Sequence, residues 1–470
     1  MPSTTAATPL RSSRLRRIVA AYTINRLGTW FGFIALSVAV FDQTHDALAV
    51  AALLLAGQVL PAFLVPALVA RVEASARRGE LSALYFFEAA TSGGLVALLL
   101  WHFSLPAILF LVILDGTAAL AASALLRAAA AREARVWAHA AHAGPAGGES
   151  SAGSRSSAAI SDHSPRDPAA DLEAAAVEAE RRANAALNIG FALTFTLGPA
   201  LAGLMVPAFG APAALAVDLV SFLICGFMLL DLAPHVEDTE TSSVAARMRA
   251  AWEYINSARV LRTLLLVEAV ALVFFEFSPP IEVAYAKLSL HAGDGGYGVL
   301  LGVWGLGVAI GSVVFARSVE RSLGVLLGAS TLAVGVAYLG WAVAPTLAIA
   351  CLAGLIGGVG NGVQWAALIS AVQRLTPPRL HGRLMGAVES LGAICPALGF
   401  VLGSAITSLS TPRDAFLVAG VGASLSTIAF LRLGLGIAMV DREQGEESPV
   451  AELVPAEVAS AASESLQTSR

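Results

Sequence analysis

Residues 346–371 read TLAIACLAGLIGGVGNGVQWAALISA, a run without a single charged side chain. The hydrocarbon core of a bilayer is about 30 Å thick and an α-helix rises about 1.5 Å per residue, so roughly 20 apolar residues suffice to cross it. This run is therefore long enough to span a membrane as one helix. Its continuous apolar character excludes the short alternating strands of a membrane barrel.

The rest of the chain has the same character. Of its 470 residues only 13% are charged, whereas soluble domains carry about 25%. This composition excludes a water-soluble globule, and a net charge of −5 disfavours a nucleic-acid-binding protein. The three cysteines lie far apart inside apolar runs and form no CxxC pair. We therefore expect no metal site and no cofactor.

Similar runs elsewhere predict an all-α, polytopic membrane protein with 12 transmembrane helices. The predicted spans are 18–41, 47–70, 81–101, 105–126, 185–206, 211–232, 261–285, 296–315, 323–343, 346–371, 384–409 and 415–440. The first run is about 24 residues long and lacks a small-residue cleavage site, so we interpret it as a span and not as a signal peptide.

The loops on the two sides of these spans differ in charge. One side has short loops and only Lys287 and Arg413 as basic residues, while the other side carries most of the arginines. The positive-inside rule then places both termini in the cytoplasm. We expect a multi-pass protein of the plasma or inner membrane.

Four segments lie outside the predicted spans. These are a cytoplasmic amino terminus (1–17), a loop after spans one to four (127–184), a linker after spans five and six (233–260) and a tail after spans seven to twelve, at 441–470. Within the loop, residues 138–168 are rich in Ala, Gly, Ser and Pro and are predicted to be disordered, while 171–183 form a charged helix. The linker is predicted to contain a surface helix, and the acidic tail to be disordered.

The chain resembles the major facilitator superfamily, in its enterobactin-exporter-like and macrolide-efflux-like branch. The resemblance depends on Arg26 with Gly28-Thr29-Trp30, Leu60-Pro61, Ala183-Asn184, the run 198–203 (GPALAG), Gln373 with Pro377, and Gly382-Arg383. It implies two pseudo-symmetric six-helix bundles that rock around a site near the membrane midplane. Spans one, four, seven and ten would then face a central cavity.

Two family signatures are matched in part. The exporter signature GxxxGPxxGG is matched at Gly198, Pro199 and Gly203 but not at Thr194 and Ala202, and its presence implies export. The alternative is a plain packing face of small residues. After span two, Ala70 stands where the family has an aspartate, while Arg71 remains.

Three ionisable residues fall near the middle of spans that the resemblance places around the cavity: Arg26, Asp115 and Glu276. Such groups are costly in lipid unless they are paired or face water, so they mark functional sites. We hypothesise that Arg26 pairs with Asp115 and that Glu276 exchanges a proton or meets a cationic cargo. A static ion pair that fixes helix register is the alternative.

Other polar groups are weaker candidates. Cavity-lining roles are predicted for Trp304, Asn361, Gln364 and Trp365, because amides and indoles suit a bulky cargo. The acids Glu88, Asp218, Glu268, Glu282 and Glu389 lie nearer the span ends. Pro279-Pro280 predicts a break in span seven.

No HExxH, GxSxG or phosphate-binding loop is present, so we expect no enzyme. The sequence favours a monomeric, proton-coupled exporter of a medium-sized, partly apolar compound such as a drug, macrolide or siderophore. An importer or facilitator of a small solute, and a sensor that keeps the fold without transporting, are the alternatives.

Overall fold

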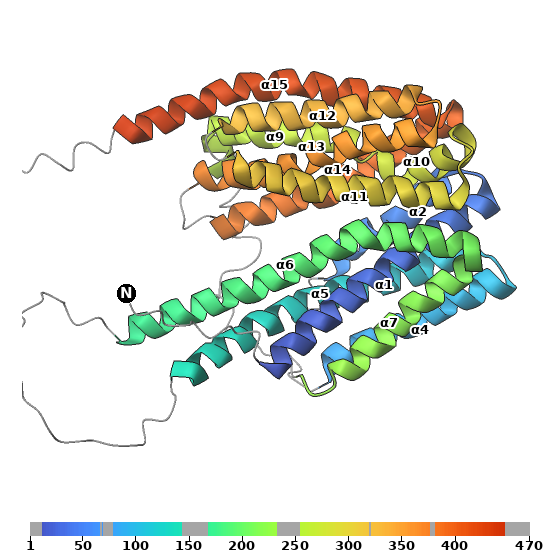
Figure 1. Cartoon of the computed structure of the whole chain (residues 1–470), viewed down its shortest axis with the longest axis horizontal. Coiled ribbons are helices and arrows are strands. Elements are labelled where there is room, and N and C mark those ends of the chain that lie inside the picture. Colours follow the sequence, from blue (N-terminus) through green and yellow to red (C-terminus); the bar gives the residue numbers. More distant parts are fainter. Residues whose placement is uncertain are drawn as a thin grey trace, which may run out of the picture.

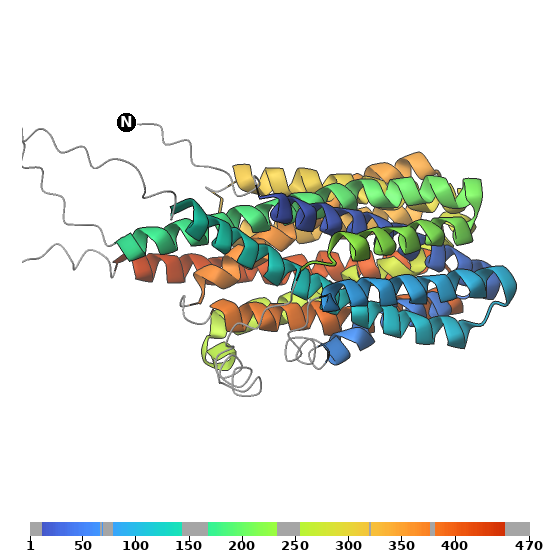
Figure 2. The ribbon, with the colours of Figure 1, turned by 90° about the horizontal axis from the view of Figure 1, so that it is seen from below.

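The computed structural model describes residues 12–65, 68, 79–142, 168–232, 254–318, 321–376 and 381–446. Within these ranges every regular element is a helix, which confirms the predicted fold class. The helices run along one common direction in two bundles, the first formed by α1 to α7 and the second by α9 to α15 (Figure 1). The view turned by 90° shows the same shared direction (Figure 2).

The helices of the first bundle follow the order of the predicted spans one to six. They are α1 (Ser13–Thr44), α2 (Ala47–Leu54) with the π-helical η2 (Leu55–Val59), α4 (Glu80–Trp101), α5 (Leu105–His142), α6 (Pro168–Phe209) and α7 (Ala211–Met228).

The second bundle contains a broken helix followed by five continuous ones. They are α9 (Arg259–Phe275), α10 (Ser278–Ala284) and the π-helical η3 (Tyr285–Ser289), then α11 (Gly293–Arg317), α12 (Leu323–Val343), α13 (Leu347–Arg374), α14 (His381–Leu409) and α15 (Pro412–Glu446).

Among the described residues, ten helices are long and apolar enough to cross a membrane. The predicted spans seven and eleven are not among them, since span seven is divided into α9, α10 and η3 and the apolar helical part of α14 is the shorter segment Ile394–Leu409. The protein is a multi-pass membrane protein, and the count of 12 spans stays a prediction.

The break in span seven occurs where the sequence predicts it. Pro279 lacks a backbone N–H and crowds the preceding turn. The helix α9 consequently ends at Phe275, and Glu276 occupies its C-cap position. The carboxyl group of Glu276 thus lies at an interruption of the backbone ladder.

Two helices extend further than predicted. Helix α5 continues to His142 and α15 continues to Glu446, into segments predicted to be disordered. The segment after Leu126 contains the alanine run 128–131, and alanine has the highest intrinsic helix propensity. Most of the predicted insertion and of the linker, and all of the tail beyond 446, lie outside the described residues.

Large apolar side chains cover the outer surface of the bundles. Leu204 on α6 and Leu266 on α9 are 64% and 62% exposed. In a membrane protein such side chains contact lipid tails, so their exposure carries no cost. The polar groups described below lie inside the bundles and at their two ends.

Candidate functional site

Arg26 lies on α1 and reaches toward α5 and α6. Its guanidinium donates a hydrogen bond to Ser123 Oγ at 3.2 Å and lies 5.4 and 5.9 Å from the ring centroids of Tyr22 and Phe191. The predicted ion pair with Asp115 is not formed in this structure. Two aromatic faces and a hydroxyl hold the guanidinium instead.

Asp115, on α5, is bound to α4. Thr91 Oγ1 donates to Asp115 Oδ1 at 2.6 Å and also lies 2.9 Å from the backbone oxygen of Glu88. The side chain of Asp115 is half-buried. A hydroxyl on the neighbouring helix therefore fixes the orientation of this carboxyl group.

Two further acids lie close to Asp115. Glu88 is fully buried and neither of its carboxyl oxygens has a hydrogen-bond partner in the part of the chain that the structure describes, while Asp218 on α7 accepts a 3.5 Å hydrogen bond from Ser92. All three carboxyl groups interact electrostatically. Glu88 and Asp218 were predicted to be weaker candidates because they lie nearer the span ends, and the structure places both beside Asp115.

A sequence signal for Asp218 was available. Gly28 and Gly32 are one helical turn apart on α1, and the Asp218 side chain lies directly against both. Small residues at this spacing let a neighbouring helix approach closely. The pair thus marks the face of α1 that receives the acidic side chain of α7.

In the second bundle, Glu276 differs from its acidic neighbours. Its side chain is half-buried and forms no hydrogen bond with any described residue, while Gly399 of α14 packs against its Cβ. Glu282, on α10, is 5% exposed and accepts a hydrogen bond from Ser278. Glu276 is therefore an accessible carboxyl group at a helix break.

Gln364 belongs to a buried network. It is 3% exposed, and its Nε2 donates to Glu268 Oε2 at 2.8 Å. Its Oε1 accepts from Ser330 at 2.5 Å and from Thr331 at 2.9 Å. The cavity role of Gln364 stays a prediction; in this structure Glu268 and two hydroxyls satisfy the amide inside the bundle.

The other three predicted lining residues lie in different surroundings. Trp304 stacks on Tyr338 with centroids 5.8 Å apart and contacts Trp341 at 5.6 Å. Asn361 is half-buried, and Trp365 is 47% exposed. The structure therefore does not bring these three side chains together in one shared contact.

The glycines of the α6 signature lie at helix contacts. Gly198 packs against Trp30 of α1, and Gly203 packs against Gly298 of α11. Helix α6 runs through Pro199 without a break. Two of the signature positions are thus places where only the absence of a side chain permits the contact.

The remaining signature residues can be placed only in part. Gly382 and Arg383 lie in the first turn of α14. Arg71 lies outside the described residues.

The bundles are joined at one end. We call this the short-loop end; it carries the turns at 45–46, 102–104, 210, 344–346 and 410–411. There, Lys287 of η3 forms ion pairs with Asp42 of α1 and with Asp294. Ser408 of α14 donates to Asp46 at 2.8 Å. These contacts close the short-loop end between the bundles.

Helices α6 and α11 show the same asymmetry. They touch at Gly203 with Gly298, at Ala200 with Gly302, and where Thr196 Oγ1 lies 3.4 Å from the oxygen of Gly305. Beyond these positions they separate toward the opposite end, where α1 begins and α15 ends (Figure 1). We call that end the terminal end.

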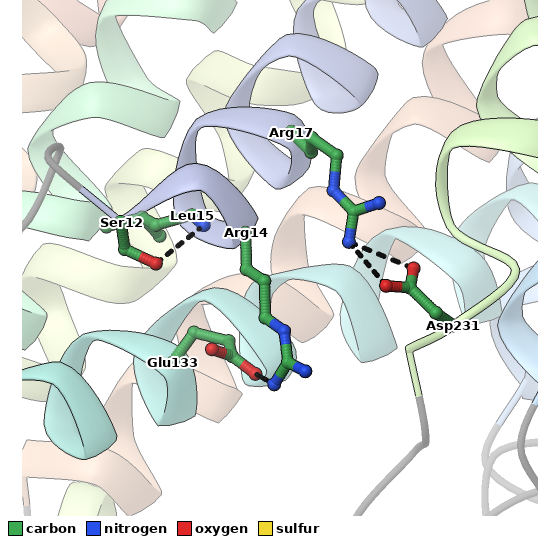
Figure 3. A network of polar contacts seen from close by, with 6 residues as sticks. All are labelled: Ser12, Arg14, Leu15, Arg17, Glu133 and Asp231. Atoms are coloured by element: carbon green, nitrogen blue, oxygen red, sulfur yellow. Dashed lines mark hydrogen bonds and ion pairs between the residues drawn. The ribbon is translucent and has the colours of Figure 1, made fainter.

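Ion pairs at the terminal end lie within the first bundle. Arg17 donates to both carboxyl oxygens of Asp231 at 2.9 and 2.7 Å, and Arg14 lies 3.7 Å from Glu133 (Figure 3). The hydrogen bonds from Arg17 lower the pKa of Asp231. This network links α1 to α5 and to the end of α7.

Comparisons with known proteins agree with this architecture. A model of the transmembrane secretion effector family matches residues 170–461. The multidrug efflux pump Tap of Mycobacterium tuberculosis (strain ATCC 25618 / H37Rv) is 24% identical over 277 residues, which cover 54% of this chain and 61% of the pump. The Mycolicibacterium fortuitum pump of that name is 25% identical over 279 residues, covering 55% and 62%. The match spans about six tenths of these relatives.

Solved structures share the fold at low identity. The nucleoside transporter NupG superimposes with a TM-score of 0.63 at 11% identity, covering 90% of this chain and 99% of that one. A bacterial homologue of the iron transporter ferroportin in an inward-facing state gives 0.62 at 16%, covering 90% and 98%. The family match covers more than half of the chain, and both structures have its fold. The chain belongs to the transmembrane secretion effector family of the major facilitator superfamily.

Proposed function

We propose that this transporter is a proton-coupled exporter of a medium-sized, partly apolar compound such as a drug, macrolide or siderophore. The observation that carries the proposal is Glu276: a carboxyl group at the break of a span, partly exposed and without a hydrogen-bond partner among the described residues. An ionisable group inside a span is costly unless water or a partner receives it. A carboxyl group avoids this cost in both of its protonation states: the charged form where water or a partner receives it, and the neutral form where neither does.

The structure corresponds to one state of a transport cycle, in which one end is closed. The bundles are joined at the short-loop end by the Lys287 and Asp46 contacts, and α6 and α11 diverge toward the terminal end. The arginine distribution supports a cytoplasmic location of the terminal end. In this arrangement cargo enters from the cytoplasm. When the short-loop contacts break and contacts at the terminal end form, the cargo is released outside.

Protons complete the cycle in the opposite direction. With the short-loop end open, Glu276 takes up a proton from outside as cargo leaves. With the terminal end open, the proton passes to the cytoplasm as new cargo binds. The Tap relatives are named multidrug efflux pumps, and the exporter signature is matched in part around Pro199. Both observations support export over import. We propose that the monomer in the plasma membrane is the working unit.

The test is transport into inverted membrane vesicles that contain the protein. An acidic lumen should drive accumulation of candidate drugs, macrolides or siderophores, and an ionophore that collapses the pH gradient should stop it. Vesicles without the protein provide the control. Accumulation that persists after collapse would contradict proton coupling, and cargo movement only out of the lumen would indicate an importer.

A further inference from the structure

A cavity of about 550 Å³ lies between the start of α9 and the far part of α15. Its wall includes two arginines and a threonine, with apolar side chains beside them: Arg259, Arg432, Thr263, Val260, Leu425 and Ile428. The cavity is in the second bundle at the terminal end. None of these side chains belongs to the acidic groups described above.

The two arginines carry positive charge that no described residue neutralises. Neither Arg259 nor Arg432 forms an ion pair with a described carboxylate, and both side chains are exposed. Arg259 is also the first residue of α9, whose first turn contains no acidic residue and whose N-cap, Ala258, offers no side-chain acceptor. The free N–H groups of a helix start add positive potential there.

The apolar part of the cavity continues along the membrane-spanning surface. Leu425 and Ile428 on α15 are 62% and 52% exposed, and Arg259 is the first residue of α9, just before the predicted span 261–285. Arg432 lines the same cavity as Arg259, so both guanidiniums lie near the start of that span, beside a hydrocarbon-facing wall. A phospholipid has the same division, with a charged phosphate next to acyl chains.

A related cavity in the first bundle shows why charge matters. It measures about 750 Å³ and lies where α1 begins beside the end of α7. There, Asp231 holds Arg17 at 2.7 Å, and Arg14 faces Glu133 at 3.7 Å. Acidic side chains of the protein thus hold Arg14 and Arg17, while Arg16 also lines that cavity. Within the described part of the chain, neither Arg259 nor Arg432 has such a partner.

We propose that the α9–α15 cavity binds an anionic phospholipid, with the phosphate held by Arg259 and Arg432 and an acyl chain lying along Leu425 and Ile428. Basic pockets between spans on the cytoplasmic side are suited to acidic headgroups. The bound lipid would fix the start of α9 against α15. The site is independent of the direction and of the coupling of transport.

The experiment uses the purified full-length protein, stripped of lipid, and counts bound lipids by native mass spectrometry. Phosphatidylglycerol should bind in preference to phosphatidylcholine. The double variant Arg259→Gln/Arg432→Gln should bind phosphatidylglycerol about 30-fold more weakly, because each basic side chain at an anionic surface contributes about fivefold. Arg259→Lys/Arg432→Lys should retain most of the affinity.

The matched control is Arg317→Gln/Arg321→Gln, which removes the same charge at the last residue of α11 and just after it, at the same end of the molecule. This control should change phosphatidylglycerol affinity by less than about twofold. Equal losses in the two double variants would show a general charge effect and overturn the site. Lipid binding without headgroup preference, or binding of inorganic phosphate as tight as that of phosphatidylglycerol, would also overturn it.

Discussion

The two bundles repeat one architecture but accommodate acidic groups in different ways. In the first bundle, the Arg26 guanidinium shares the interior with three carboxyl groups and interacts electrostatically with Glu88. In the second bundle, Glu268 and Glu282 are held by an amide and a hydroxyl, and no described basic side chain pairs with Glu276.

The difference teaches that a repeated fold does not repeat its polar chemistry. In the first bundle Arg26 interacts electrostatically with Glu88, but the three carboxyl groups there also repel one another. A carboxyl group in the second bundle is neutralised at low cost only by a proton. The first bundle thus groups its acids beside a cation, whereas no described cation pairs with Glu276.

The largest expected effect comes from breaking the contact through which the bundles move against each other. Gly203→Ala places a methyl group against the backbone of Gly298, and overpacking of this kind costs about 1–3 kcal/mol. We expect lower thermal stability and a loss of most vesicle transport. In Gly295→Ala the added Cβ has ordinary contacts of 3.7 Å or more, so this variant should behave as wild type. Equal behaviour of the two variants would contradict the packing role.

The next prediction makes the first bundle resemble the second. Arg26→Gln removes the described cation that interacts with the acidic group there, and pH-driven transport should fall by about tenfold, equivalent to ~1.4 kcal/mol. Arg26→Lys keeps the charge but loses the planar contact with Tyr22 and Phe191, so its loss should be smaller. Transport rates in vesicles, normalised to the amount of protein, measure both. A larger loss in the lysine variant would show that stacking, not charge, matters.

A smaller effect is expected at the junction of the bundles. Lys287 is the single lysine of the chain, so an amine-reactive reagent followed by peptide mass spectrometry reports on this one side chain. Asp42→Asn removes its partner in the first bundle and should raise the labelling rate about threefold, since partly exposed ion pairs contribute up to ~1 kcal/mol. Asp294→Asn removes a partner within the second bundle and should raise it less. The reverse order would contradict a latch between bundles.

The smallest effect concerns the terminal end of the first bundle. Arg17 lowers the pKa of Asp231, so their contact stabilises the fold above the usual carboxyl pKa and is lost as the pH falls through the lowered value. Both side chains are largely exposed, and Asp231→Asn should cost at most about 1 kcal/mol at pH 7. Thermal unfolding should show this difference disappearing in acid. A difference that grows on acidification would contradict the assignment.

Much of the fold follows from the sequence because the bilayer imposes one length and one hydrogen-bonding rule on every span. The order of the helices and the break before Pro279 were predicted in this way. The end of α5 was not, since an alanine-rich segment keeps its helix beyond the apolar run. Length and composition locate a span, but they do not predict where a helix ends once it has left the membrane.

The site was less predictable because side-chain partners depend on how helices rotate against each other. Arg26 and Asp115 were expected to pair, yet Arg26 contacts aromatic rings and Asp115 accepts a hydrogen bond from Thr91. Gln364 was expected in a cavity, yet it binds Glu268. Depth in a span can be counted from the sequence, whereas the facing direction of a polar residue requires the packed structure.

The most direct test compares the same substitution at two acids: Glu276, at the C-cap of α9, and Glu268, within that helix. Uptake driven by an acidic lumen should be abolished in Glu276→Gln, because an amide cannot carry the proton. It should persist in Glu268→Gln, whose side chain is buried in a hydrogen-bonded network away from exchange. Both variants should fold and reach the membrane. Undiminished pH-driven uptake by the folded Glu276→Gln protein would contradict the central claim.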